Sequence, residues 1–208
     1  MEQFHYLNAD GEFDYELYKR VQIAGNRRKL DWQWVDENAV AYLASYITRQ
    51  TSPSFALCHG TRRGNEQLWF RERLQGCEVI GTEISDTARD FPFTVQWDFH
   101  DENPTWLGRA DFVYSNSWDH SYDPRRLFPT WAGQLAPGGL LILEHTSQHI
   151  RAKELDPFGA TLEELIELLN QVLPPTVTFK EVLTDGPGTM LNGEEWFEAN
   201  YVVFQAHL

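Results

Sequence analysis

The sequence predicts an α/β fold, in which a doubly wound and mostly parallel sheet carries helices on both faces. From residue 54 onward, short apolar runs alternate with helical or turn-rich stretches, which is typical of strands and helices that alternate around a parallel sheet. One capped helix and two more apolar runs follow, and they predict a terminal hairpin. A chain of 208 residues fits one domain, so residues 1–208 are expected to form a single unit.

The first segment, residues 1–50, is expected to supply N-terminal helices. Apolar residues recur there at spacings of three and four, which predicts helical structure over 12–50 with a break near Gly25 and Asn26. The apolar positions are Phe13, Leu17, Val21, Val40, Leu43, Ala44 and Ile47.

The second segment, residues 53–150, is expected to form the core of the sheet. Four apolar runs predict strands at 55–58, 78–82, 110–115 and 139–143, and a weaker run predicts another at 93–97. Residues 67–74, between the first two runs, have the pattern of a helix.

The third segment, residues 151–208, is expected to add one helix and the hairpin. Thr161 and Glu164 have the spacing of a capping box at the start of an apolar-periodic stretch, so a helix is predicted to begin there. Pro174 and Pro175 end it. The runs 176–183 and 201–206, joined by a loop that contains Gly and Pro, predict the hairpin.

Charge and composition exclude several classes of partner. Lys and Arg number 17 against 31 Asp and Glu, and the net charge of −14 repels phosphate backbones and anionic lipid surfaces, so neither nucleic acid nor a membrane is expected as a partner. No stretch approaches the ~20 apolar residues that cross a bilayer, and residues 1–10 lack the features of a signal peptide. A cytoplasmic protein is therefore expected, with Cys58 and Cys77 as free thiols.

The loop after the first predicted strand has the composition of a ligand-binding turn. Residues 58–66 read Cys-His-Gly-Thr-Arg-Arg-Gly-Asn-Glu. Glycines let a backbone approach a ligand closely, and in nucleotide-binding folds this loop lies at the carboxyl edge of the sheet, where ligands bind. The same two glycines would also suit a tight turn with a purely steric purpose. The candidate cofactor-binding residues of this loop are His59, Gly60, Thr61, Arg62 and Gly64.

Acidic side chains follow the next strands at the same edge. Glu83 ends the second predicted strand about 20 residues beyond the loop, where a carboxylate characteristically accepts the ribose hydroxyl protons. Asp98 ends the weaker strand and can accept from an adenine amino group. Further candidates for cofactor binding are the strand-end residues Ile84, Phe99, Ser115 and Asn116.

From about residue 54 to 145, these features resemble the class I S-adenosylmethionine (SAM)-dependent methyltransferases. Residues 135–143, Leu-Ala-Pro-Gly-Gly-Leu-Leu-Ile-Leu, look like the family's turn and fifth strand, while 110–116 and 79–85 look like its fourth and second strands. The resemblance implies a Rossmann-like, seven-stranded sheet whose final strand is antiparallel, with SAM as cofactor of the 53–150 core. It also makes the region of Tyr15, Tyr18 and residues 32–34 a candidate lid over the pocket.

The glycine loop departs from the family's pattern. Members usually show an acidic residue, a spacer and then glycines at alternate positions. Here Cys58 replaces the acid and Arg62 replaces the middle glycine. The resemblance therefore implies an altered environment for the methionine part of the cofactor.

The segment that follows the fourth predicted strand supplies the candidate catalytic residues. The resemblance puts residues 117–123 at the substrate-facing side, where Asp119 and His120 are found. His120 is the candidate general base, although a histidine in an acidic loop also suits a merely hydrogen-bonded role. Residues 115–118 lack the Asn/Asp-Pro-Pro-aromatic motif of many methyltransferases of DNA bases and protein glutamines. By elimination, the expected acceptor is an oxygen of a small molecule.

The carboxylates and imidazoles of this region are side chains of the kinds that bind divalent metal ions. The residues are Asp119, His120, Asp123, His145 and His149. Their spacing does not fix a coordination geometry, so no metal is expected.

Two other functions stay open. The strand, loop and acid arrangement is shared with NAD-dependent oxidoreductases, although the full glycine fingerprint of those enzymes is missing. The departures at Cys58 and Arg62 would also suit a non-catalytic relative that binds a nucleoside or a partner. The terminal hairpin can face solvent or a twin subunit, which leaves a homodimer open.

Overall fold

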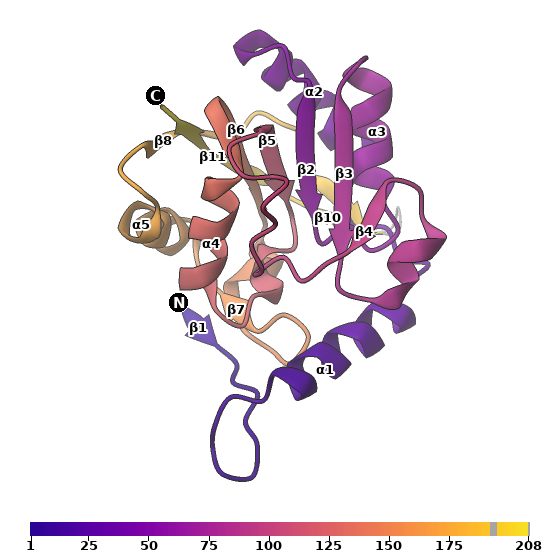
Figure 1. Ribbon diagram of the computed structural model, residues 1–208, viewed down its shortest axis with the longest axis vertical. Helices are drawn as coiled ribbons and strands as arrows, with labels where there is room; N and C mark the ends of the chain where they lie inside the picture. The colour runs from indigo at the N-terminus through magenta and orange to yellow at the C-terminus, as the bar shows by residue number, and fades with distance from the viewer. Residues whose placement is uncertain (192–194, 208) are drawn as a thin grey trace.

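The structure, a computed structural model, describes residues 1–191 and 195–207 and is built on one seven-stranded sheet (Figure 1). The strand order is β4-β3-β2-β5-β6-β11-β8. The bounds of these strands are β2 Phe55–His59, β3 Glu78–Glu83, β4 Thr94–Gln96, β5 Ala110–Ser115, β6 Leu135–His145, β8 Val177–Leu183 and β11 Asn200–Ala206.

The direction of the strands confirms the predicted sheet. The five strands from β4 to β6 pair in parallel. β11 pairs antiparallel with both β6 and β8, so β8 runs in the same direction as the first five strands. Six strands are therefore parallel and one is antiparallel. β6 is longer than the predicted run 139–143 at both ends. Its start continues through an irregularity in its pairing with β5 between Ala110 and Phe112, and its last residues, Glu144 and His145, pair with β11.

Helices cover both faces of the sheet, as predicted (Figure 1). The bounds are α1 Tyr15–Arg28, α2 Glu37–Gln50, α3 Asn65–Arg73, α4 Pro124–Gly133 and α5 Leu162–Val172. One apolar core packs α2 and α3 against the sheet, and a second core packs α4 and α5 against the other face. Strands covered on both faces carry nearly continuous apolar runs, which is why all five residues of β2 are buried.

The helices α1, α2, α4 and α5 each begin at a side-chain cap. Asp14, Asp36 and Asp123 accept from backbone N–H groups of α1, α2 and α4 respectively. Thr161 and Glu164 form the predicted capping box at the start of α5.

The predicted helix break near Gly25 and Asn26 is wrong, because α1 continues to Arg28 and the chain leaves helical structure only over 29–36. Gly25 serves a different purpose. A Cβ at this position would lie 2.6 Å from Leu155 Cδ2, so the glycine allows α1 to approach the 151–157 loop closely. α1 thereby lies across the carboxyl ends of the strands (Figure 1).

Short elements complete the chain. They are the strands β1 Glu2–Gln3, β7 Phe158–Gly159, β9 Thr189–Leu191 and β10 Glu195–Phe197, and the 3-10 helices η1 Asp86–Asp90, η2 Trp118–His120 and η3 Ser147–Ile150. β1 pairs with β7, and β9 pairs with β10 inside the connection that joins β8 to β11. Both Cys58 and Cys77 are buried free thiols, as predicted. Among the helices of the described ranges, none has the length and apolar character needed to cross a bilayer.

Candidate cofactor and acceptor site

The loop between β2 and α3 has left-handed backbone at alternate positions. The φ angles of Gly60, Arg62 and Gly64 are +75°, +46° and +77°. The N–H groups of Gly60 and Thr61 donate to the carbonyl of Thr82, which ties the loop to β3. The backbone of this loop is therefore that of three glycines at alternate positions, although the middle residue, Arg62, carries a side chain.

Gly60 is the point of closest approach to the next strand connection. A Cβ at Gly60 would lie 2.6 Å from the Cβ of Ser117, closer than side-chain atoms pack. Glycine is therefore required here by space as well as by its positive φ.

Arg62 is unusual because a side chain occupies a left-handed position. L-residues other than glycine adopt this backbone at a cost of roughly 1–2 kcal/mol. The guanidinium Nη1 donates to the carbonyl of Trp32 at 3.0 Å, which joins the loop to the segment after α1. Burial lowers the pKa of Arg62, and Glu66 and Glu83 partly offset that effect.

Glu83 ends β3 with its carboxylate next to the glycine loop. Oε2 accepts the N–H of Arg62 at 3.1 Å and Oε1 accepts the N–H of Ser85 at 2.9 Å. The residue is only 7% exposed, and burial raises its pKa. Since a carboxylate has about four lone-pair positions, two bonds to the backbone and one from the Asn26 side chain still leave acceptor capacity for a ligand.

A first pocket lies between α1, the glycine loop and the end of β3. Five of the predicted cofactor-binding residues line it: Gly60, Arg62, Glu83, Ile84 and Phe99. Tyr18, from the candidate lid, also lines the pocket. The sequence reasoning missed other lining residues on α1 and after β4, among them Gln22, Asn26 and Trp97. Pocket walls of this kind, mainly apolar with one buried acid, suit a nucleoside.

Three predicted residues lie near this pocket without lining it. The His59 ring is buried between Thr82 Oγ1 and Gln134 Oε1, at 2.9 and 2.8 Å, and burial lowers its pKa to about 4. Ser115 Oγ donates to the His59 carbonyl at 2.9 Å. Gly64 caps α3 with its left-handed backbone. These three residues support the glycine loop without lining the first pocket.

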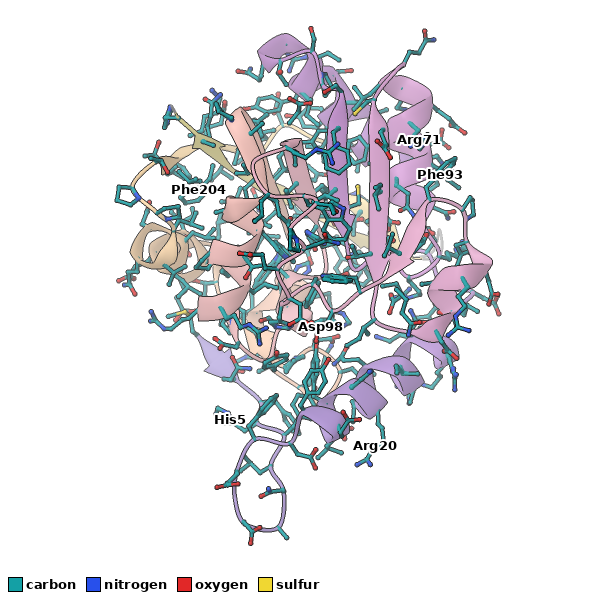
Figure 2. All side chains as sticks on the ribbon, in the orientation of Figure 1. His5, Arg20, Arg71, Phe93, Asp98 and Phe204 are labelled. Atoms are coloured by element: carbon teal, nitrogen blue, oxygen red, sulfur yellow. The ribbon has the colours of Figure 1, made fainter. Side chains whose placement is uncertain are left out.

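Asp98 also lies outside the pocket lining, and both of its oxygens have hydrogen-bond partners. Oδ1 accepts from the N–H of His100 at 3.0 Å and contacts His100 Nδ1 at 2.8 Å. Oδ2 accepts from the hydroxyl of Tyr15 at 2.8 Å. Figure 2 shows Asp98 at the lower edge of the sheet, above α1. Bonds from His100 and Tyr15 lower the pKa of Asp98 despite its burial.

A second pocket adjoins the first. The two pockets share Lys29, Arg62, Ser117 and His120 as lining residues. Asn116 lines the second pocket, and Asn116 and Thr61 both line a smaller third pocket beside the glycine loop. A ligand in the first pocket and a ligand in the second would therefore meet at the shared side chains.

Asp119 and His120, on η2, both line the second pocket. His120 Nδ1 lies 2.8 Å from Gln22 Oε1, and Nε2 lies 3.4 Å from Asp156 Oδ1. Burial lowers the pKa of His120, whereas burial raises the pKa of Asp119 to about 7. Asp156 is a site residue that the sequence reasoning missed, because it lies in an irregular loop without a motif.

The other candidate metal ligands from the sequence, Asp123, His145 and His149, do not converge on Asp119 and His120. Asp123 caps α4, and His145 Nε2 contacts the carbonyl of Ala160 at 2.9 Å. His149 lines the second pocket, but its Nδ1 accepts from the N–H of Thr146 and its Nε2 lies 2.9 Å from the carbonyl of Asn116. The group of five is therefore not brought together.

Known proteins were compared with the chain by sequence and by structure. No model of a protein family matches it, and no curated protein matches it in sequence. Solved structures do match. A Burkholderia thailandensis 1,6-didemethyltoxoflavin-N1-methyltransferase, bound to 1,6-didemethyltoxoflavin and S-adenosylhomocysteine, has a TM-score of 0.63 and 16% identity over 100% of both chains.

Two further structures match over most of their length. A TehB-like SAM-dependent methyltransferase from Corynebacterium glutamicum has a TM-score of 0.58 and 16% identity over 82% of this chain and 89% of that one. The [4+2]-cyclase SpnF has a TM-score of 0.57 and 13% identity over 80% of each chain. The chain therefore has the Rossmann-like fold that these three proteins share.

Proposed function

We propose that the chain binds SAM in the first pocket and transfers its methyl group to a small molecule held in the second. The observation that carries this proposal is the contact between the two pockets. Both open onto Arg62, Ser117 and His120, so a donor and an acceptor bound on either side would be neighbours. Positioning of this kind can supply several kcal/mol toward an in-line displacement.

The first pocket suits the adenosine part of SAM. Glu83 would accept the ribose hydroxyls with its remaining lone pairs, and Ile84 and Phe99 would contact the adenine ring. Asp98 would act indirectly, since its bond to Tyr15 holds α1 across the pocket. The methionine part would then reach the glycine loop, where Arg62 and Thr61 stand in place of an open glycine turn.

The second pocket suits an acceptor that reacts through oxygen. When bound, SAM supplies an electrophilic methyl group on a sulfonium. The acceptor oxygen forms a bond to the methyl carbon, the carbon–sulfur bond breaks, and S-adenosylhomocysteine is the product. We assign removal of the acceptor's proton to His120 and Asp119, because both side chains line this pocket.

Calorimetric titration with S-adenosylhomocysteine tests the cofactor site. Saturable binding is expected in the wild-type protein and should weaken by about 10–100-fold in Glu83→Gln, which loses charge-assisted acceptance from the ribose. Glu78→Gln, at the exposed start of the same strand, is the matched control. Absence of binding by the folded wild-type protein would refute the cofactor assignment.

Methyl transfer itself needs a second measurement, because the fold also occurs in a cyclase. Incubation with methyl-labelled SAM and a panel of small hydroxylated and amino compounds should yield a labelled product from a hydroxylated one. Label only on amines would refute the oxygen acceptor, and binding of S-adenosylhomocysteine without any transfer would favour the non-catalytic alternative.

A further inference from the structure

Three side chains in the second pocket have the arrangement of metal ligands. Asp119 and His120 come from η2, and Asp156 comes from the loop that precedes β7. Each offers one ligand atom, and these atoms all lie within 4.8 Å of one another. Two carboxylates and one imidazole therefore converge on one point from two separate segments of the chain.

The hydrogen bonds of Gln22 fix which nitrogen of His120 carries the proton. Gln22 Nε2 donates to the carbonyl of Leu155 at 3.1 Å, and a carbonyl can only accept. The amide oxygen of Gln22 is thereby turned toward His120, and it must accept a proton from His120 Nδ1 at 2.8 Å. A neutral His120 ring then presents the lone pair of Nε2 to Asp156 Oδ1, an oxygen that also carries lone pairs.

Such a contact between lone pairs is unfavourable unless a proton or a cation lies between the two atoms. A histidine that binds a metal commonly donates its other ring N–H to an oxygen, which fixes its tautomer and orientation. Gln22 provides that oxygen for His120. The environment of the ring is therefore the one that a metal ligand requires.

Asp119 supplies a second, independent observation. Its side chain is 7% exposed, and Oδ1 has no hydrogen-bond partner among the residues that the structure describes. A buried carboxylate oxygen without a partner costs free energy, which a bound ligand would recover. Asp156 has one oxygen bonded to Lys153 Nζ at 2.9 Å, and the other faces His120.

We propose that Asp119, His120 and Asp156 bind one divalent transition-metal cation in the second pocket, and that its open coordination positions receive the acceptor oxygen. An imidazole with two carboxylates suits Mn²⁺, Fe²⁺, Co²⁺ or Zn²⁺, whereas Ca²⁺ and Mg²⁺ prefer oxygen ligands alone. Lys29, Arg62 and Lys153 line the same pocket, so their charges reduce the affinity for the cation.

The inference rests on the proposed function only for the role of the ion, and not for its binding. A hydroxyl on the cation has a lowered pKa, so it would release its proton to water at the mouth of the pocket. The resulting alkoxide forms the oxygen–methyl bond as the carbon–sulfur bond of SAM breaks. The cation keeps its oxidation state. In the metal-bound protein Asp119 and His120 hold the cation, so water takes the proton that these two residues would accept in the metal-free protein.

Titration of chelator-treated protein with Co²⁺ tests the site without an activity assay. Wild-type protein is expected to bind one Co²⁺ with visible absorption bands of a nitrogen and oxygen ligand set. Asp119→Asn, His120→Gln and Asp156→Asn should each weaken binding by about 10-fold or more. Gln22→Met, which keeps all three ligands, should weaken binding by about 10–100-fold because it removes the partner that orients His120.

Matched controls lie outside the pocket. His5→Gln, on the exposed N-terminal segment (Figure 2), and Asp10→Asn should leave Co²⁺ binding unchanged. Wild-type protein that binds no Co²⁺ or Mn²⁺ stoichiometrically would overturn the proposal, as would unchanged binding in a folded Asp119→Asn, Asp156→Asn double variant. S-Adenosylhomocysteine binding in the same samples separates this failure from failure of the proposed function, because the first pocket needs neither carboxylate.

Discussion

The hydroxyl of Tyr15 donates to Asp98 Oδ2 at 2.8 Å and so joins the first turn of α1 to the chain just after β4. Tyr15 and Asp98 are 83 positions apart in sequence. The helix α1, which begins at Tyr15, crosses the first pocket. The carboxylate expected to contact adenine is therefore used to hold the helix that covers the pocket.

Removing this bond should make the first pocket easier to open. Loss of one hydrogen bond to a charged group is worth about 1.5–3 kcal/mol, so Tyr15→Phe should release S-adenosylhomocysteine about 10-fold faster. Stopped-flow tryptophan fluorescence can follow the release, because Trp97 lines the pocket. Tyr42→Phe removes a similar bond, to Asp185 Oδ1 at 2.5 Å, on a different part of the surface and should leave the rate unchanged.

Crowding at Gly60 can be separated from backbone strain. Gly60→Ala adds a Cβ against Ser117 at a position with φ of +75°, so it should lower the free energy of unfolding by about 3 kcal/mol. Gly76→Ala has φ of +84° with open space around the new Cβ, and it should cost only about 1 kcal/mol. Urea unfolding measures both. Equal costs at the two positions would show that the contact with Ser117 is not tight.

The left-handed backbone at Arg62 predicts an order of stability for two variants. Arg62→Ala and Arg62→Gly both lose the bond to the Trp32 carbonyl, but only glycine relieves the strain at φ of +46°. Arg62→Gly should therefore unfold at a free energy about 1 kcal/mol higher than Arg62→Ala in the same urea titration. Equal stability of Arg62→Ala and Arg62→Gly would show that the backbone carries no strain at residue 62.

Burial of His59 predicts a contribution to stability that depends on pH. The folded-state pKa of about 4 lies below the ordinary value of 6.5, so the unfolded chain takes up the proton first as the pH falls. The stabilising contribution is complete above pH 6.5 and is lost toward pH 4. Between pH 7 and pH 5 the wild-type protein should lose about 2 kcal/mol that His59→Gln does not lose.

Other buried groups change the stability of the protein with pH in the direction opposite to His59. The contribution of His59 is therefore measured as the difference between the wild-type protein and His59→Gln. Burial raises the pKa of Glu66 and Glu144 to about 7, so their contributions are lost as the pH rises. These contributions cancel in the difference between wild type and variant. His5→Gln, at an exposed histidine, should behave as the wild type, and an identical pH profile for His59→Gln would contradict the assigned cause.

The sheet could be predicted from sequence because its strands are buried on both faces. Residues 55–58 and 110–115 are therefore almost uninterrupted apolar runs, and Glu83 stands out at the end of another. Parallel strands bring their carboxyl ends to one edge, so the order of strands was sufficient to place Glu83 near the glycine loop.

The site was less predictable where it depends on contacts between distant segments. Asp156 lies in an irregular loop without periodicity, and only packing against η2 brings it to His120. The partner of Asp98 is Tyr15, and no local pattern links the two residues. In the sequence, a glycine at position 25 suggests a helix break. In the structure, Gly25 lies inside α1 and allows the close contact with Leu155.

The position of β11 also constrains the order in which the sheet can assemble. β8 precedes β11 in the chain, yet within the seven-stranded sheet it pairs only with β11. β8 therefore joins the rest of the sheet only through the antiparallel pairing of β11 with β6. Until that step, β6 is an open edge, and such edges are where molecules pair with one another and aggregate. A chain in which β11 has not yet aligned with β6 therefore leaves this edge open to self-association.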